Sequence, residues 1–124
     1  MNGEELVERA EAAAEHAYAP YSNYLVGAAV LARDGRVFEG VNVENAAYPL
    51  GICAEQTAIA KAASEGIRPG ELEAIGSTAS PCGGCRQWLH EWRFDRVYFR
   101  NADGEVVEYV PGDLLPVTWD LPET

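Results

Sequence analysis

The sequence predicts an α/β fold in which helices cover both faces of a mixed five-stranded sheet, a three-layer α-β-α sandwich. Two observations lead to this prediction. Segments with helical spacing of apolar residues alternate with short apolar runs bounded by turn residues, in the order α-β-β-α-β-α-β-β. The chain of 124 residues is also long enough to bury one independent core, so we expect a single domain over residues 1–124.

Periodicity and turn residues define the individual elements. Predicted helices space their apolar residues every three or four positions, and predicted strands are short apolar or alternating runs. Pro20 ends the first helix, Asp34-Gly35 joins a hairpin, Gly66 ends the second helix, and Asp103-Gly104 joins the last two strands. The predicted ranges are helix 4–18, strands 26–31 and 37–43, helix 53–65, strand 72–77, helix 82–92, strands 96–99 and 106–110, and a short turn at 113–115.

The acidic composition restricts the partners of this chain. Nine Lys and Arg against twenty Asp and Glu give a net charge of −11, and no stretch supplies the basic groove that a nucleic-acid backbone requires. We therefore expect no nucleic-acid polymer as a partner. The acidic start lacks the features of a secretory signal, and no apolar run is long enough to span a membrane. We expect a cytoplasmic location and no membrane partner.

The sharpest signal is the position of the three cysteines. Cys53 opens one predicted helix, and Cys82 and Cys85 open another directly after a strand. Helix N-termini stabilise thiolates, and a spacing of three residues places Cys82 and Cys85 on one helical face, where both sulfurs can hold one ion. Three protein ligands leave a tetrahedral zinc ion with one open position, which is the arrangement of a catalytic site.

Other interpretations of these cysteines leave residues unexplained. A CxxC pair is also typical of a thioredoxin-type redox motif or of half a structural zinc site. A redox dithiol leaves Cys53 without a role, and a structural site needs a fourth ligand. His16 and His90 are the available histidines, but a lone helical His is more often a core or surface residue than a metal ligand. An open zinc site is favoured.

Glu55 lies two residues after Cys53, in the first turn of the same predicted helix. We expect its carboxylate to lie near the metal without binding it. This is where a general acid-base is needed, because a proton must pass from an attacking water to the ring and to the departing amine. The helix dipole alone also favours an acidic residue at this position. Beside Cys53, we interpret Glu55 as the proton carrier.

These residues resemble the signature H/C-x-E with P-C-x-x-C of the zinc nucleoside and nucleotide deaminases. The sequence resembles the compact, homotetrameric branch of the cytidine deaminase family, and the matching segments follow in the same order over nearly the whole chain. The resemblance is carried by Tyr18-Ala19-Pro20-Tyr21-Ser22-Asn23-Tyr24, Val26-Gly27-Ala28-Ala29, Asn42-Val43-Glu44-Asn45-Ala46-Ala47-Tyr48, Cys82-Gly83-Gly84-Cys85-Arg86-Gln87 and Leu114-Leu115-Pro116.

The resemblance implies a cytidine deaminase-like fold, one zinc ion per subunit, a homotetramer and a role in pyrimidine salvage. The implied reaction is the hydrolytic deamination of cytidine and deoxycytidine to uridine and deoxyuridine, with release of ammonia. Asn42 and Glu44 are implied to hydrogen-bond the ribose hydroxyls. Tyr24, where the family usually has Phe, is implied to pack on the pyrimidine. The Ala54 backbone is implied to help hold the base, and Trp119 to reach the site of a neighbouring subunit.

Two departures from the family pattern bear on the site. Many relatives with three cysteines have Arg directly after the catalytic Glu, whereas this chain has Gln56. Three thiolates around a divalent ion leave one formal negative charge, and we expect Arg86 and the two helix N-termini to compensate it. We also expect the bound water to be less acidified than in relatives with Arg. The second departure is the 77–80 connection before Pro81, which is several residues shorter than in many relatives, so the resemblance does not define the fine substrate preference.

The same residues bear on other possible functions. Blasticidin-S-type deaminases share the fold and the zinc signature but need not keep the ribose-binding Asn-x-Glu, so Asn42 and Glu44 favour cytidine. Without the resemblance, these two residues are better explained as polar residues at a strand end, and the resemblance reverses that preference. A zinc-binding protein without activity is disfavoured by the intact Glu55, and a polynucleotide editor is disfavoured by the negative charge.

Overall fold

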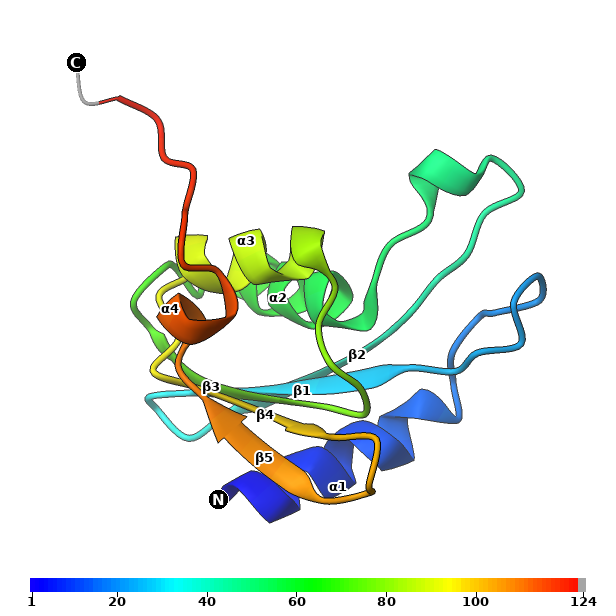
Figure 1. The fold of residues 1–124 in the computed structure, drawn as a ribbon, viewed down its shortest axis with the longest axis horizontal. Helices are drawn as coiled ribbons and strands as arrows, with labels where there is room; N and C mark the ends of the chain where they lie inside the picture. The colour runs from blue at the N-terminus through cyan, green and yellow to red at the C-terminus, as the bar shows by residue number, and fades with distance from the viewer. Residues whose placement is uncertain (123–124) are drawn as a thin grey trace.

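The structure, a computed structural model, describes residues 1–122 (Figure 1). Five strands form one mixed sheet in the order β2-β1-β3-β4-β5. β3 and β4 are parallel, and the other neighbouring pairs are antiparallel. The elements are α1 (Gly3–Ala14), β1 (Gly27–Ala32), β2 (Val37–Val41), η1 (Tyr48–Leu50), α2 (Ala54–Ser64), β3 (Leu72–Ser77), α3 (Gly83–Glu91), β4 (Arg96–Arg100), β5 (Val106–Tyr109) and α4 (Pro111–Leu114).

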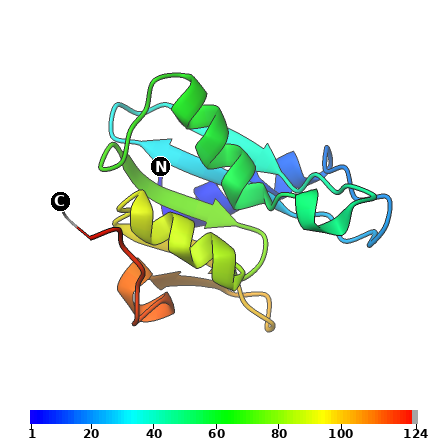
Figure 2. The ribbon, with the colours of Figure 1, turned by 90° about the horizontal axis from the view of Figure 1, so that it is seen from above.

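The helices form a layer on each side of the sheet. α1 packs across one face, and α2 and α3 lie side by side on the opposite face (Figures 1 and 2). This arrangement confirms the three-layer α/β sandwich predicted from the sequence. Among residues 1–122, no helix has both the length and the apolar character needed to cross a bilayer.

The predicted order of elements is confirmed, but the first helix is shorter than predicted. α1 ends at Ala14, whereas helical spacing suggested a helix up to Tyr18. The Tyr18 N–H instead donates to the Asn42 carbonyl at 3.0 Å, and its carbonyl accepts from the Glu44 N–H at 2.8 Å. Pairing with this distant segment provides hydrogen bonds that compete with the last helical turn. η1 was not predicted because its three residues carry no periodic signal.

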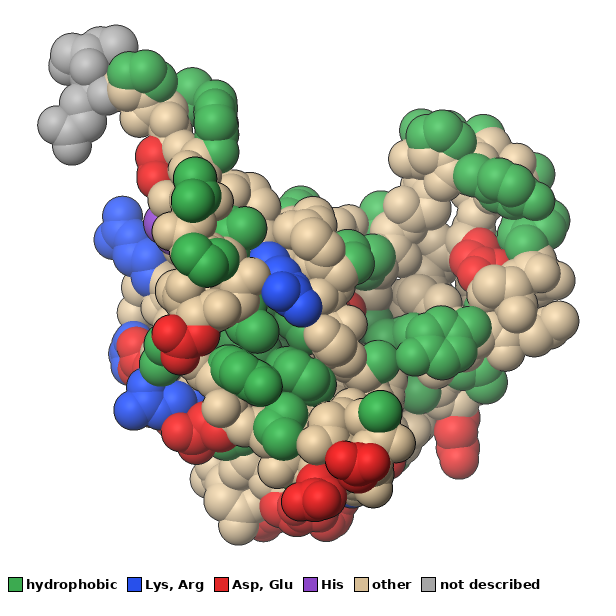
Figure 3. Space-filling view, viewed as in Figure 1, with side chains coloured by type: hydrophobic (Ala, Val, Ile, Leu, Met, Phe, Trp, Pro, Cys, Tyr) green, Lys and Arg blue, Asp and Glu red, His purple; other side chains and the backbone are tan. Residues whose placement is uncertain are grey.

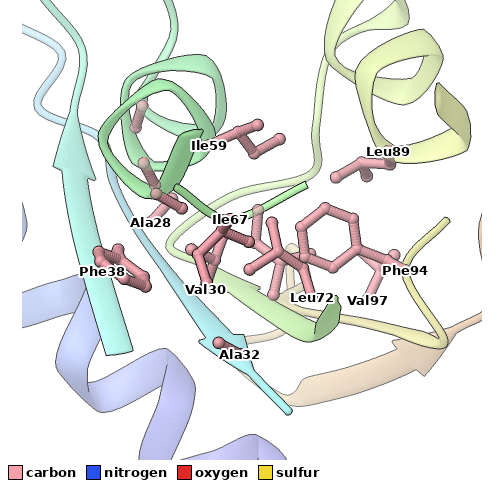
Figure 4. Close-up of a cluster of buried hydrophobic side chains, with 14 of the residues drawn as sticks. Ala28, Val30, Ala32, Phe38, Ile59, Ile67, Leu72, Leu89, Phe94 and Val97 are labelled. Atoms are coloured by element: carbon pink, nitrogen blue, oxygen red, sulfur yellow. The ribbon is translucent and has the colours of Figure 1, made fainter. Parts of the chain in front are cut away.

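A buried apolar cluster fixes α2 and α3 to the sheet (Figure 4). Val30 and Leu72 from the sheet, Ile59 from α2 and Leu89 from α3 are all 0% exposed. Burying an aliphatic side chain of this size stabilises the fold by roughly 1.5–3 kcal/mol. The two helices whose first turns carry the cysteines are therefore held on a rigid support.

Gly40 in β2 lets α2 approach the sheet closely. A Cβ atom at this position would lie 2.3 Å from the Ala58 nitrogen and 2.6 Å from the Ala54 oxygen, so a larger residue would push the helix away. Ala54 and Ala58 are themselves fully buried. The first turn of α2 is thus held directly against β2.

Two loops project together from one end of the sheet, residues 15–26 between α1 and β1 and residues 42–53 between β2 and α2 (Figure 1). In the space-filling view the surface is hollowed between these loops and the body of the protein (Figure 3). Many of their large apolar side chains are exposed. They include Tyr18, Tyr21, Tyr24, Leu25, Tyr48, Leu50 and Ile52.

Candidate metal centre and active site

The three cysteines converge where α2 and α3 begin. Cys53 is the N-cap of α2, Cys82 is the N-cap of α3, and Cys85 lies in the first turn of α3. The sulfur of Cys82 lies 3.7 Å from that of Cys53 and 3.4 Å from that of Cys85, and all three lie within 4.8 Å of one another. Tetrahedral zinc with Zn–S bonds of about 2.3 Å needs sulfurs about 3.8 Å apart. The donor set therefore fits one zinc ion.

The helix N-terminus favours the thiolate form of Cys82. Partial burial opposes ionisation, but the backbone N–H groups of Cys85 and Gly84 and the neighbouring thiols lower the pKa of Cys82. Burial raises the pKa of Cys53, and burial together with the Glu55 carboxylate raises the pKa of Cys85. A coordinated cation reverses this preference, so zinc uptake must displace protons from the two thiols with raised pKa values.

Among residues 1–122, the one cluster of side chains that could hold a metal ion is formed by the three cysteines, with no fourth ligand in it. His90, considered from the sequence as a fourth ligand, instead places its Nε2 2.8 Å from Asp120 Oδ1. His16 lies exposed after α1. Three protein ligands would leave one position of a tetrahedron for water or substrate, and this open position stays a prediction.

Glu55 is almost fully buried beside the cysteines. Its side chain is 4% exposed, and it lines the same cleft as Cys53 and Cys82. Burial raises the pKa of Glu55, partly offset by a backbone hydrogen bond. A raised pKa brings a carboxyl group closer to the operating pH, which favours work as a general acid-base.

The cleft has a volume of about 360 Å³ and brings the predicted catalytic and substrate-binding residues together. This volume lies toward the small end of the about 300–1,000 Å³ typical of small-molecule sites. Residues not singled out from the sequence also line it, notably Tyr48, Ile52 and Ser80. Tyr48 closes the Asn42–Tyr48 segment that carries the resemblance, which was a usable signal. The residues predicted to contact the nucleoside that line the cleft are Tyr24, Asn42, Glu44 and Ala54.

Asn42 connects the cleft to the loop that carries Tyr24. Its Oδ1 accepts from the Val26 N–H at 2.9 Å, and its Nδ2 donates to the Tyr24 carbonyl at 2.9 Å. The amide group keeps one further hydrogen and further acceptor capacity, so it can still bind a ligand. Asn42 therefore fixes the backbone on both sides of Leu25.

Glu44 makes a second connection to the same loop. Its Oε1 accepts from the backbone N–H groups of Tyr21 at 3.0 Å and Ser22 at 3.1 Å, and its Oε2 accepts from the Ser22 hydroxyl. The Ser22 hydroxyl and these N–H groups outweigh desolvation and lower the pKa of Glu44. The carboxylate is therefore charged at neutral pH.

The two residues expected to influence the charge of the zinc site have different surroundings. Gln56 lies in α2 with its Nε2 3.8 Å from the Cys85 sulfur, as a neutral donor. The Arg86 guanidinium donates to the carbonyls of Pro81 and Leu114, both at 3.0 Å, and to the Ser80 hydroxyl at 3.2 Å. These Arg86 bonds brace the loop that precedes Cys82. Compensation of the site charge by Arg86 stays a prediction.

Trp119 does not line this cleft. Its side chain is 64% exposed, and its backbone pairs with the Gln87 side chain of α3, with the Gln87 Nε2 donating to the Trp119 carbonyl at 2.8 Å. The single chain therefore leaves Trp119 on an outer surface, and its contact with a neighbouring subunit stays a prediction.

Comparisons with known proteins agree with this geometry. Residues 1–101 match the family described as the cytidine and deoxycytidylate deaminase zinc-binding region. The cytidine deaminase of Sporosarcina psychrophila is 42% identical, over 94% of this chain and 90% of the relative. The crystal structure of cytidine deaminase from Burkholderia pseudomallei superposes with a TM-score of 0.89 at 46% identity, covering 96% of this chain and 100% of that chain.

A more distant relative shows the same architecture. The crystal structure of dCMP deaminase from the cyanophage S-TIM5 has a TM-score of 0.66 and 26% identity, covering 82% of this chain and 85% of that chain. The family match covers more than half of the chain and includes all three cysteines. The chain thus belongs to the cytidine deaminase family, and Cys53, Cys82 and Cys85 are its zinc-binding residues.

Proposed function

We propose that this protein, as a single catalytic domain over residues 1–124, hydrolyses the exocyclic C–N bond of cytidine and deoxycytidine. The products are uridine or deoxyuridine and ammonia. One observation carries the proposal: a three-thiol zinc site, the buried Glu55 and the polar pair Asn42 and Glu44 line or border one cleft. The nucleoside deaminases to which the chain is 42–46% identical support the same reaction.

The metal end supplies the attacking water and the proton carrier. Zinc held by the three cysteines supplies a Lewis acid that makes water nucleophilic at neutral pH. Glu55 takes a proton from the water that attacks C4 of the pyrimidine and gives it to the ring nitrogen N3. It then takes the second proton from the new C4 hydroxyl and gives it to the departing amine. The C4–O bond forms, the C4–N bond breaks, and the amine leaves as ammonia. Reduced thiols are required throughout, which fits a cytoplasmic enzyme.

The other end of the cleft recognises the nucleoside. Asn42 and Glu44 are suited to hydrogen-bond sugar hydroxyls, and the half-exposed ring of Tyr24 offers a face for the base. Ala54 is the first residue of α2, and the N-terminus of this helix has no side-chain cap. The backbone N–H of Ala54 can therefore donate a hydrogen bond to the base. The charged Glu44 disfavours a phosphate on the sugar, which supports a nucleoside over a nucleotide.

We also propose a homotetramer. The projecting loops leave several large apolar side chains exposed, among them Tyr48 at 76% and Leu50 at 69%. Clusters of this kind typically mark an interface with another chain. Light scattering on the purified protein tests the proposal: a mass four times that of one chain is expected, and a monomer at micromolar concentration would contradict it.

A substrate panel tests the reaction. The zinc-loaded protein is assayed spectrophotometrically with cytidine, deoxycytidine, cytosine, dCMP and blasticidin S. We expect turnover of both nucleosides with much slower or no turnover of the others. Blasticidin S as the best substrate would support the alternative of an analogue deaminase with this fold, and no turnover of either nucleoside would refute the proposed reaction.

A further inference from the structure

Ser22 is hydrogen-bonded to both the sugar-binding and the base-binding part of the proposed site. Its hydroxyl donates to Oε2 of Glu44 and accepts from the Tyr24 N–H at 3.0 Å. The turn that allows this depends on Asn23, which adopts a left-handed backbone with φ 58°, a conformation that Asn tolerates better than most residues. Two residues of opposite loops are thus connected through one hydroxyl group.

The hydrogen bonds at Glu44 leave little freedom for its carboxylate. A carboxylate offers about four acceptor positions, two on each oxygen. The N–H groups of Tyr21 and Ser22 occupy both positions on Oε1, and the Ser22 hydroxyl occupies one on Oε2. One acceptor position on Oε2 remains for a ligand. Its direction is set by the three bonds to residues 21–22.

Ser22 holds Glu44 from the side away from the substrate. Glu44 lines the proposed nucleoside cleft, and it also lines a second hollow of about 310 Å³ that includes Tyr21 and Ser22. Ser22 itself does not line the nucleoside cleft. Without the serine hydroxyl, the carboxylate loses its bond on Oε2 and can rotate toward the second hollow. The free acceptor position on Oε2 of Glu44 would then face away from the sugar for part of the time.

We propose that Ser22 is a positioning residue for sugar recognition, which orients the Glu44 carboxylate toward a sugar hydroxyl and never contacts the substrate. This inference rests on the proposed function, because it assumes that the ligand of the cleft is a nucleoside. It goes further by assigning the discrimination between sugars with and without hydroxyl groups to a residue outside the cleft. Loss of the Ser22 hydroxyl should therefore weaken the binding of ligands that carry sugar hydroxyls and leave the binding of ligands without them unchanged.

The test compares the binding of uridine and 2′,3′-dideoxyuridine to the zinc-loaded protein by calorimetry. We expect Ser22→Ala to raise the dissociation constant of uridine by about tenfold, the usual effect of disturbing a hydrogen bond to a charged group. The dissociation constant of dideoxyuridine should stay within about twofold of the wild-type value. Ser22→Thr keeps the hydroxyl on an exposed residue and should restore uridine binding. Ser64→Ala is the matched control, because its hydroxyl bonds the Lys61 carbonyl at the end of α2.

Turnover provides a second measurement. For cytidine, Ser22→Ala should raise KM by about tenfold with kcat within about twofold of the wild type. If Ser22 had a purely structural role, Ser22→Ala would loosen the loop that carries Tyr24, and the binding of both ligands would weaken equally. That result, or unchanged uridine binding in Ser22→Ala, would overturn the inference. Failure of the wild type to deaminate cytidine would instead refute the proposed reaction, because uridine binding does not depend on turnover.

Discussion

The two ends of the cleft are built in different ways. At the metal end, Cys85 is 0% exposed and Glu55 is 4% exposed, and both lie in the first turns of helices packed on the core. At the end proposed to bind the sugar, called the sugar end below, Tyr24 is 61% exposed and Tyr48 is 76% exposed, and the loops are joined by side-chain hydrogen bonds. If the proposed function is correct, the reaction chemistry depends on rigid elements, whereas nucleoside recognition depends on contacts between loops. Substitutions at the first end should change kcat or metal binding, and those at the second should change KM.

The largest expected effect is at the metal end. Glu55→Gln should lower kcat for cytidine by about 10²–10⁴-fold or more, because the amide cannot carry a proton between water and the amine. Zinc content should stay near one ion per chain, since Glu55 is not among the three ligands. Steady-state kinetics and metal analysis on the same sample test this. An active, folded Glu55→Gln protein would contradict the proposed role.

Zinc binding should weaken as the pH falls. The pKa values of Cys53 and Cys85 are raised without metal, so these thiols hold protons that zinc must displace. Each displaced proton lowers the apparent affinity about tenfold for every pH unit of acidification. Competition with a chelator between pH 8 and pH 6, corrected for chelator protonation, measures this. An affinity that does not change with pH would show that the thiols are already ionised.

At the sugar end, Asn42→Ala should mainly affect binding. It removes hydrogen bonds to the Tyr24 carbonyl and the Val26 N–H and also an expected contact to the sugar. We expect KM for cytidine to rise by about 10-fold or more, with kcat reduced much less than in Glu55→Gln. Steady-state kinetics of Asn42→Ala and Glu55→Gln, measured side by side, test this difference. A loss confined to kcat would show that the two ends do not act separately.

The smallest expected effect concerns the residue next to Glu55. Gln56 donates a neutral hydrogen bond to the Cys85 sulfur, so Gln56→Arg would bring a positive charge to the zinc site. The charge should acidify the bound water and move the acidic limb of the pH-rate profile down by about one unit or less. If the acidic limb of the pH-rate profile did not move in a variant that still binds zinc, the negative charge of the zinc site would not be undercompensated with Gln56.

The metal end was predictable from the sequence because its signals are local. A three-residue spacing places Cys82 and Cys85 on one helical face, and Glu55 follows Cys53 within one turn. The α/β order was predictable for the same reason, since each element carries its own periodicity. Local rules do not show how distant segments meet, and α1 ended at Ala14 rather than Tyr18 for that reason.

The sugar end could be assigned only through resemblance, because its hydrogen bonds join loops about twenty residues apart in the chain. No spacing rule connects Ser22 with Glu44 or places Tyr48 and Ser80 in one cleft. The helix η1, which leads from Tyr48 toward α2, also lacks a sequence pattern of its own. Trp119 is predicted to contact a neighbouring subunit, and a contact between chains has no local pattern in the sequence of one chain.

We expect the three cysteine sulfurs to hold one zinc ion whose fourth position stays open beside Glu55. X-ray absorption at the zinc edge of the purified, ligand-free protein tests it most directly. We expect three sulfurs at about 2.3 Å from the zinc and one light atom at about 2.0 Å, without the imidazole signature, at one zinc per chain. Fewer than three sulfurs, or a histidine in the fourth position, would contradict this expectation.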